Sequence, residues 1–167
     1  LFFYVLLIFK DAINGFSDPD NDITEIDVYI PSKKIGIEYD GRWWHRDRRE
    51  KDKRKEISVR NAGIDLIHIV EDDTVSTPIQ VSGNIHYNFR ASTGYDDMIR
   101  FVLENILLCN IDPEFVCTQR DRFSIWSQYS SYRKDKSISA LYPEIAKEWD
   151  YSQNGDLRPD ACLAHSS

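Results

Sequence analysis

The sequence predicts an α/β fold with a mixed β-sheet flanked by helices, and two observations support this prediction. Residues 25–30 and 35–40 are rich in β-branched and aromatic residues, alternate in polarity and flank the turn formers of residues 31–34, which indicates a β-hairpin. A charged helical segment over residues 46–62 then leads to the apolar run 64–70. Strand, helix and strand in this order form a right-handed crossover, so we expect residues 64–70 to lie parallel to residues 35–40.

The N-terminal residues LFFYVLLIF predict the last part of a buried helix that ends near Asn14 and Gly15 and would begin before residue 1. This run is shorter than the roughly 20 residues that cross a bilayer, and no signal-peptide features surround it; a membrane tail is the minor alternative. Residues 15–24 hold many turn formers and predict a polar loop. Three cysteines without zinc-site spacing predict reduced thiols in a cytoplasmic protein.

The predicted hairpin groups acids on one face and apolar residues on the other. With Ile30 opposite Ile35, the acidic face holds Glu25, Asp27, Glu38 and Asp40, and the core face holds Ile26, Val28, Ile37 and Tyr39. Like charges paired across strands at ~5 Å destabilise a sheet, whereas a hard divalent cation binds such oxygens. The pattern therefore indicates a Mg²⁺ or Mn²⁺ site at Asp27, Glu38 and Asp40. The alternative is an acidic surface that faces water and keeps the protein soluble.

Residues 42–60 hold nine Arg or Lys and four Asp or Glu, a net charge of +5 in a chain whose net charge is −7. A basic segment beside an acidic cluster suggests that a polyanion such as DNA is brought to a metal site. The alternative is a solvated helix with ion pairs between residues four apart, ended by Ala62 and Gly63. The side chains expected to contact DNA are Arg42, Trp44, Arg46, Arg48, Arg49, Lys53 and Lys55.

Beyond this region the sequence predicts packing elements without a catalytic role. His68, within the 64–70 strand, is expected to be a core or rim histidine rather than a metal ligand. The later elements are expected to be a long loop over 73–94 with a short strand at 86–89, a helix over 96–109, a last strand at 115–118 and a helix over 120–132.

The segments IEYDGRWWH and REKDKRKEISVRNAGIDLIHIVED together resemble the core of the very-short-patch-repair endonuclease family. That family belongs to the restriction-endonuclease-like, PD-(D/E)XK superfamily, and the resemblance covers residues 24–72. It implies a restriction-endonuclease-like sheet and a metal-dependent DNA endonuclease that hydrolyses phosphodiester bonds with Mg²⁺ or Mn²⁺.

The resemblance also implies roles for single residues. Asp27 and Glu38 match the metal-binding acids, and His45 matches the histidine of the family's Trp-His pair, as a general acid or base. Asp40 falls where the superfamily often has lysine, so Lys53 or Lys55 from the helix, or a second metal at Asp40, would supply the positive charge. The implied catalytic residues are Asp27, Glu38, Asp40 and His45. The superfamily's N-terminal Glu would precede residue 1.

Residues 134–167 differ in character from the predicted nuclease domain of residues 1–133. The motifs LYPEIAKEWD and NGDLRP resemble the start of a treble-clef zinc-ribbon repeat. Cys162 and His165 make half of a zinc site, and no partner pair follows, so we expect a truncated module without zinc.

Three alternative functions stay open. The first is a nucleic-acid-binding module that kept the fold and lost catalysis, which Asp40 in place of the superfamily lysine and the missing N-terminal Glu both favour. The second is an interaction domain of a larger DNA repair or defence protein, and the third is a nuclease directed at RNA. A homodimer is compatible with each of these functions.

Overall fold

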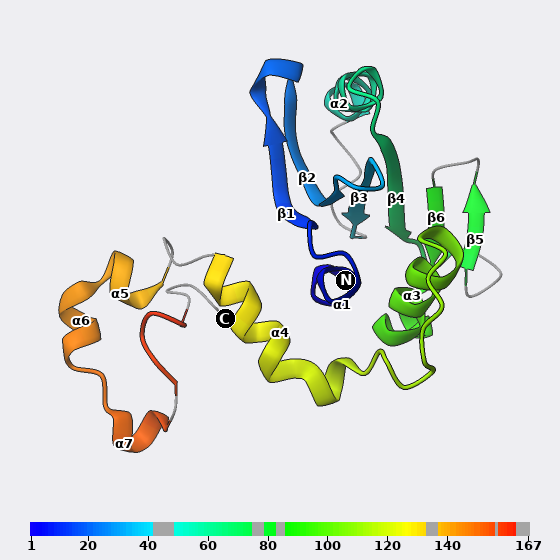
Figure 1. The fold of residues 1–167 in the computed structure, drawn as a ribbon. Coiled ribbons are helices and arrows are strands. Elements are labelled where there is room, and N and C mark those ends of the chain that lie inside the picture. Colours follow the sequence, from blue (N-terminus) through cyan, green and yellow to red (C-terminus); the bar gives the residue numbers. More distant parts are fainter. Residues whose placement is uncertain (42–48, 75–78, 83–85, 133–136, 156, 163–167) are drawn as a thin grey trace. The chain divides into compact units, whose positions relative to one another are not determined.

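The structure is a computed structural model that describes residues 1–41, 49–74, 79–82, 86–132, 137–155 and 157–162 (Figure 1). For residues 49–53, 79–82 and 91 it describes the backbone alone. The chain forms two compact units, Leu1–Val116 and Cys117–Ser167. The helix over residues 120–132, which the sequence analysis placed in the nuclease domain, belongs to the second unit by this division.

The first unit contains a six-stranded mixed sheet with the strand order β1-β2-β3-β4-β6-β5 (Figure 1). Strands β3, β4 and β6 are mutually parallel, and the other neighbouring pairs are antiparallel. The mixed sheet flanked by helices confirms the predicted fold class. Its elements are α1 (Phe2–Ile8), β1 (Ile13–Asp18), η1 (Pro19–Asn21), β2 (Ile23–Ile30), β3 (Ile35–Asp40), α2 (Arg49–Asn61), β4 (Asp65–Glu71), β5 (Ile79–Ser82), β6 (His86–Phe89), η2 (Ala91–Thr93), α3 (Tyr95–Phe101) and the π-helical turn η3 (Val102–Ile106).

The β2–β3 hairpin has the predicted register, with Ile30 opposite Ile35 and Val28 opposite Ile37. The predicted core face is wrong at one position, because Ile26 packs with Val59 and Leu66 on the side of the sheet that α2 covers. Gly36 leaves room for the Ile26 side chain on the α2 side of the sheet. A Cβ at that position would lie 3.1 Å from both Ile26 Cγ2 and Leu66 Cδ1, so any side chain would crowd them.

The crossover from β3 through α2 to β4 confirms the predicted parallel pair. Its register runs from Ile35 opposite Asp65 to Asp40 opposite Val70. Helix α2 ends at Asn61, close to the predicted Ala62-Gly63 stop, and Gly63 has a φ of 73°, the left-handed conformation that favours glycine after a helix. Strand β4 therefore begins after a short turn that follows the end of α2.

Helix α3 covers the face of the sheet opposite α2. On β4 and β6, Ile69 and Tyr87 are paired and point away from α2, and the Tyr87 ring lies 5.8 Å from that of Phe101. The predicted helix over 96–109 is confirmed as α3 continued by η3, but it ends at Ile106, and Leu108 adopts a φ of 54°.

The N-terminal prediction is wrong in two places. Helix α1 ends at Ile8 rather than near Gly15, and most of the predicted polar loop is strand, because residues 15–18 belong to β1 and residues 23–24 to β2, with which β1 pairs. The Phe16 ring lies 4.4 Å from Tyr29, so pairing and aromatic packing outweigh the turn-forming composition. The turn formers Pro19, Asp20 and Asn21 make only the short η1 that joins the two strands.

Two further predictions change between residues 73 and 118. Strand β6 confirms the short strand at 86–89, but the predicted long loop also contains β5, which pairs with β6. The strand predicted at 115–118 does not form, because the Phe115 ring packs 6.0 Å from that of Tyr4 and Thr118 already begins α4.

The second unit is helical in its described part. It contains α4 (Thr118–Tyr132), which confirms the helix predicted over 120–132, and the short helices α5 (Ile138–Leu141), α6 (Pro143–Lys147) and α7 (Tyr151–Asn154). Among the residues that the structure describes, neither unit has a helix with the length and apolar composition needed to span a membrane.

Candidate functional site

The candidate site lies along one row of the sheet in the first unit. Glu38 of β3 is paired with His68 of β4, and His68 is paired with His86 of β6. Paired residues on adjacent strands project from the same face, so these three side chains form a row across three strands. Asp40 lies two residues beyond Glu38 and shares that face. The register of the paired strands therefore determines that these side chains lie side by side.

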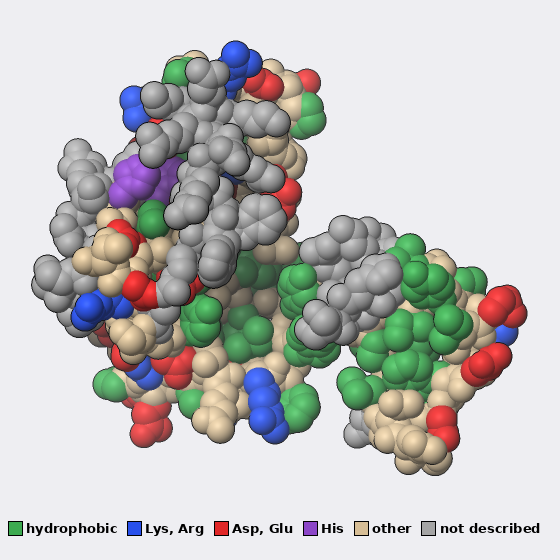
Figure 2. Space-filling view, turned by 180° about the vertical axis from the view of Figure 1, so that it is seen from behind, with side chains coloured by type: hydrophobic (Ala, Val, Ile, Leu, Met, Phe, Trp, Pro, Cys, Tyr) green, Lys and Arg blue, Asp and Glu red, His purple; other side chains and the backbone are tan. Residues whose placement is uncertain are grey.

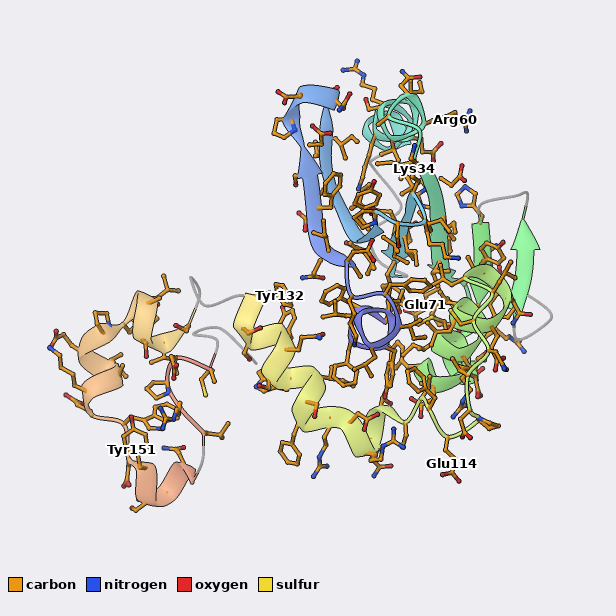
Figure 3. The ribbon with its side chains drawn as sticks, in the orientation of Figure 1. Lys34, Arg60, Glu71, Glu114, Tyr132 and Tyr151 are labelled. Atoms are coloured by element: carbon orange, nitrogen blue, oxygen red, sulfur yellow. The ribbon has the colours of Figure 1, made fainter. Side chains whose placement is uncertain are left out.

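The acidic end of the row lies toward the carboxyl end of β3, whereas His68 lies in the middle of β4 and His86 is the first residue of β6. Lys34, before β3, and Arg60, near the end of α2, lie at the opposite end of the sheet from Glu71, the last residue of β4 (Figure 3). Open α/β sheets bind ligands at the carboxyl ends of their strands. His68 and His86 are the histidines whose side chains the structure describes, and histidine reaches the surface on this unit (Figure 2).

At one end of the row, Glu38 forms an ion pair with a lysine of α2. Lys55 Nζ lies 2.6 Å from Glu38 Oε1, and the two side chains are only 20% and 14% exposed. Lys55 thus reaches Glu38 from α2. It is one of the two helix lysines that were expected to replace the superfamily lysine.

Asp27 completes this acidic group from β2. The paired register of β2 and β3 extends from Ile30 to Val28, and beyond it the Tyr39 backbone N–H donates to Asp27 Oδ2 at 2.8 Å. The side chain of Asp27 therefore takes the place of a backbone acceptor at the point where the two strands separate.

Burial raises the pKa values of both Asp27 and Glu38 above their ordinary range. For Asp27, burial outweighs the hydrogen bond from Tyr39 and the charge of Lys55. For Glu38, burial outweighs the hydrogen bond and charge of Lys55, and the charge of Asp27 raises the pKa further. The positive charge of Lys55 thus only partly offsets the effect of burial on the two carboxylates.

At the other end of the row, His68 is held between two carboxylates. Its Nδ1 lies 2.8 Å from Asp40 Oδ2, and its Nε2 lies 3.6 Å from Glu56 Oε1. His68 is 8% exposed, and its ring stacks on that of His86 at 4.7 Å between centroids and 13° between planes. Burial lowers the pKa of His68, but the Asp40 hydrogen bond and the charges of Asp40, Glu56 and Glu38 together raise it.

The three carboxylates predicted to bind metal have different partners in the structure. Asp27 accepts from Tyr39, Glu38 pairs with Lys55, and Asp40 contacts His68. Within the described residues, the potential ligand atoms that do converge, all within 4.8 Å of one another, belong to Glu56, His68 and His86. The sequence analysis missed this group because finding it requires the pairing of β4 with β6.

Most of the predicted DNA contacts are not placed by the structure. His45, a predicted catalytic residue, and Arg42, Trp44, Arg46 and Arg48 lie outside the described residues. Arg49 and Lys53 lie in α2, where the structure describes their backbone but not their side chains. In the second unit, Cys162 is a free, half-buried thiol, and His165 lies outside the described residues.

Comparison with protein-family models, with curated proteins and with solved structures finds no match for this chain.

Proposed function

We propose that this chain is a metal-dependent DNA endonuclease whose reaction centre is formed by Asp27, Glu38 and Lys55. The observation that supports it best is the group of two mostly buried carboxylates, Asp27 of β2 and Glu38 near the carboxyl end of β3, with Lys55 of α2. Hydrolysis of a phosphodiester needs a positioned water and positive charge near the developing phosphorane. Acids of this kind together with a lysine meet both needs.

The donor set fits a hard divalent cation such as Mg²⁺ or Mn²⁺. Carboxylate oxygens are its preferred ligands, and burial, which raises the pKa values of Asp27 and Glu38, disfavours their charged forms unless a cation lies beside them. When bound, such an ion lowers the pKa of its water and clamps the phosphate oxygens. Asp27 and Glu38 would hold it, and the Tyr39 N–H fixes the orientation of the Asp27 carboxylate.

Lys55 would supply the positive charge that the superfamily takes from a lysine on the strand. Its ammonium group already lies on Glu38, so a small change of rotamer brings it to a phosphate oxygen beside that acid. Asp40 has a different role in this proposal, since its carboxylate holds His68 rather than the Asp27 and Glu38 pair.

DNA is the proposed substrate because the site adjoins the basic segment of residues 42–60 in an otherwise acidic chain. Phosphate contacts by Lys and Arg release counterions, so binding should weaken steeply with salt. One observation favours a second function, a nucleic-acid-binding module without catalysis. The 2.6 Å pair between Glu38 and Lys55 already compensates one acid, and a purely structural ion pair would look the same.

Nicking of supercoiled plasmid by the full chain, with Mg²⁺, Mn²⁺ or EDTA, tests the proposal. The variants are Asp27→Asn, which keeps an acceptor for the Tyr39 N–H, and Asp20→Asn, a matched control because Asp20 is exposed in η1. We expect metal-dependent nicking that Asp27→Asn reduces at least a hundredfold and Asp20→Asn leaves unchanged. Plasmid binding without nicking would support the binding module, and nicking of RNA in preference to DNA would redirect the substrate.

A further inference from the structure

The group formed by Glu56, His68 and His86 is separate from the proposed reaction centre. It joins one helix and two strands, since Glu56 lies on α2, His68 on β4 and His86 on β6. Each residue offers one ligand atom, and these atoms lie within 4.8 Å of one another. Two imidazole nitrogens and a carboxylate oxygen are a different donor set from the all-oxygen pair of Asp27 and Glu38.

One distance in this group, between His68 Nε2 and Glu56 Oε1, is close to that expected for a tetrahedral metal. Ligand bonds of about 2.0–2.1 Å at tetrahedral angles place neighbouring donor atoms roughly 3.3 Å apart. His68 Nε2 and Glu56 Oε1 lie 3.6 Å apart, which is too long for a hydrogen bond but within a few tenths of an ångström of the metal value. The rings of His68 and His86 are stacked, with 13° between their planes. Because the lone pair of an imidazole nitrogen lies in the plane of its ring, the half-buried His86 ring must turn before both nitrogens point at one ion.

His68 Nε2 is a buried polar atom that has no hydrogen-bond partner among the described residues. The side chain is 10% exposed, and buried polar groups are normally satisfied. The other ring nitrogen already contacts Asp40 at 2.8 Å. When Nδ1 donates to Asp40, the neutral ring presents the lone pair of Nε2 toward Glu56. A carboxylate that holds a histidine in this way is the usual support of a metal-bound imidazole.

We propose that Glu56, His68 and His86 bind a divalent transition metal ion of the zinc class, with Asp40 as the positioning residue for His68. Imidazole donors favour Zn²⁺ and its neighbours over Mg²⁺, which prefers oxygen. Three protein ligands leave a fourth position for water or another small donor. Because the ion joins α2 to β4 and β6, it stabilises the first unit as well as occupying the site.

The same geometry has a metal-free interpretation, in which a protonated His68 lies between Asp40 and Glu56 as a buried ion network. The two interpretations differ in what they predict for the three ligands. A proton on His68 needs no contribution from His86, whereas a metal ion needs His86 as much as Glu56. The test therefore relies on His86, which is only half-buried and tolerates substitution better than His68.

The experiment measures binding of Zn²⁺ and Co²⁺ to the full chain after removal of metal with a chelator, using calorimetry and the visible absorption of Co²⁺. The variants are Glu56→Gln, His86→Gln and Asp40→Asn, and the controls are Asp20→Asn, an exposed residue of η1, and Cys162→Ser. We expect one ion per chain with a tetrahedral Co²⁺ spectrum. Glu56→Gln and His86→Gln should each weaken binding at least tenfold, Asp40→Asn should weaken it 10–100-fold, and both controls should leave it unchanged.

Circular dichroism of each metal-free variant shows whether it is folded. Unchanged Zn²⁺ affinity in folded Glu56→Gln and His86→Gln, or no Zn²⁺ binding at micromolar concentration by the wild type, would overturn the proposal in favour of the ion network. Loss of binding in Cys162→Ser alone would place the ion in the second unit and would also overturn it. Plasmid nicking plays no part in these measurements, so they stand apart from the endonuclease proposal.

Discussion

Replacing Lys55 by methionine tests how strongly the ion pair with Glu38 supports the reaction centre. Methionine keeps most of the apolar stem and removes the ammonium group, which lies 2.6 Å from Glu38 Oε1. The change leaves a carboxylate that is 14% exposed without its cation. We expect the pKa of Glu38 to rise further, because burial already raises it and Lys55 is the main opposing group.

The expected cost lies between two limits. Exposed ion pairs contribute about 0–1 kcal/mol, and breaking a fully buried pair costs about 3–5 kcal/mol. With side chains that are 20% and 14% exposed, Lys55→Met should destabilise the first unit by about 2–3 kcal/mol at pH 7.5. Glu38→Gln should cost only about 1 kcal/mol, because the neutral amide oxygen still accepts from Lys55. The double variant should cost about 1–2 kcal/mol, because it leaves no unpaired charge.

The assay is urea denaturation of the four proteins in EDTA, followed by far-ultraviolet circular dichroism. The two single variants and the double variant form a cycle that isolates the interaction, and we expect a coupling free energy of about 2 kcal/mol. Asp20→Asn serves as an exposed control, with no expected change. A coupling below about 0.5 kcal/mol would refute the reasoning, because it would mean that Lys55 and Glu38 are solvated independently.

Three further predictions concern the same unit. Asp27→Asn should stabilise the metal-free protein by about 0.5–2 kcal/mol at pH 7.5 while nicking is lost, because burial raises the pKa of Asp27 and the charged form is disfavoured; a destabilised variant would contradict this. Because the pKa of Asp27 is raised in the folded state, the charged carboxylate destabilises the fold only at a pH above the pKa of Asp27 in the unfolded chain. The gain from Asp27→Asn should therefore vanish in urea titrations as the pH falls below about 4. Gly36→Ala should lower stability by about 1–3 kcal/mol, because the new Cβ lies 3.1 Å from Ile26 and Leu66; an unchanged urea midpoint would show that β2 adjusts. Plasmid affinity should fall at least a hundredfold between 50 and 200 mM salt, and an affinity independent of salt in filter binding would exclude phosphate contacts.

The sequence predicted the parts of the fold that depend on local pattern. The hairpin register from Ile30 to Val28 and the parallel pairing of β3 with β4 follow from alternation, from one turn and from the handedness of the crossover. These features need contacts only between consecutive elements. The resemblance, in which Asp40 falls where the superfamily often has lysine, implied Lys53 or Lys55 as the residue that reaches the acids from the helix, and in the structure Lys55 contacts Glu38.

The parts that the sequence did not predict depend on contacts between elements distant along the chain. Strand β1 holds four turn formers among its six residues and is a strand because β2 pairs with it. Ile26 lies on the opposite face from the one predicted, because β2 separates from β3 beyond Val28 and the Ile26 side chain packs with Val59. Alternation assumes a regular strand, so it cannot show where a strand bends away from its neighbour.

The metal-binding hypothesis shows how one strand pairing changes an interpretation. Judged on its own strand, His68 had no visible partner and was assigned to the core. Pairing with β6 brings His86 against it, and α2 brings Glu56. Asp40 then changes from a proposed ligand of Mg²⁺ to the residue that orients His68. The two proposed sites therefore lie on one face of the sheet, with Asp27 and Glu38 beside β2 and the two histidines beside β6. They meet where Glu38 of β3 is paired with His68 of β4, and the charges of these two residues influence each other's pKa.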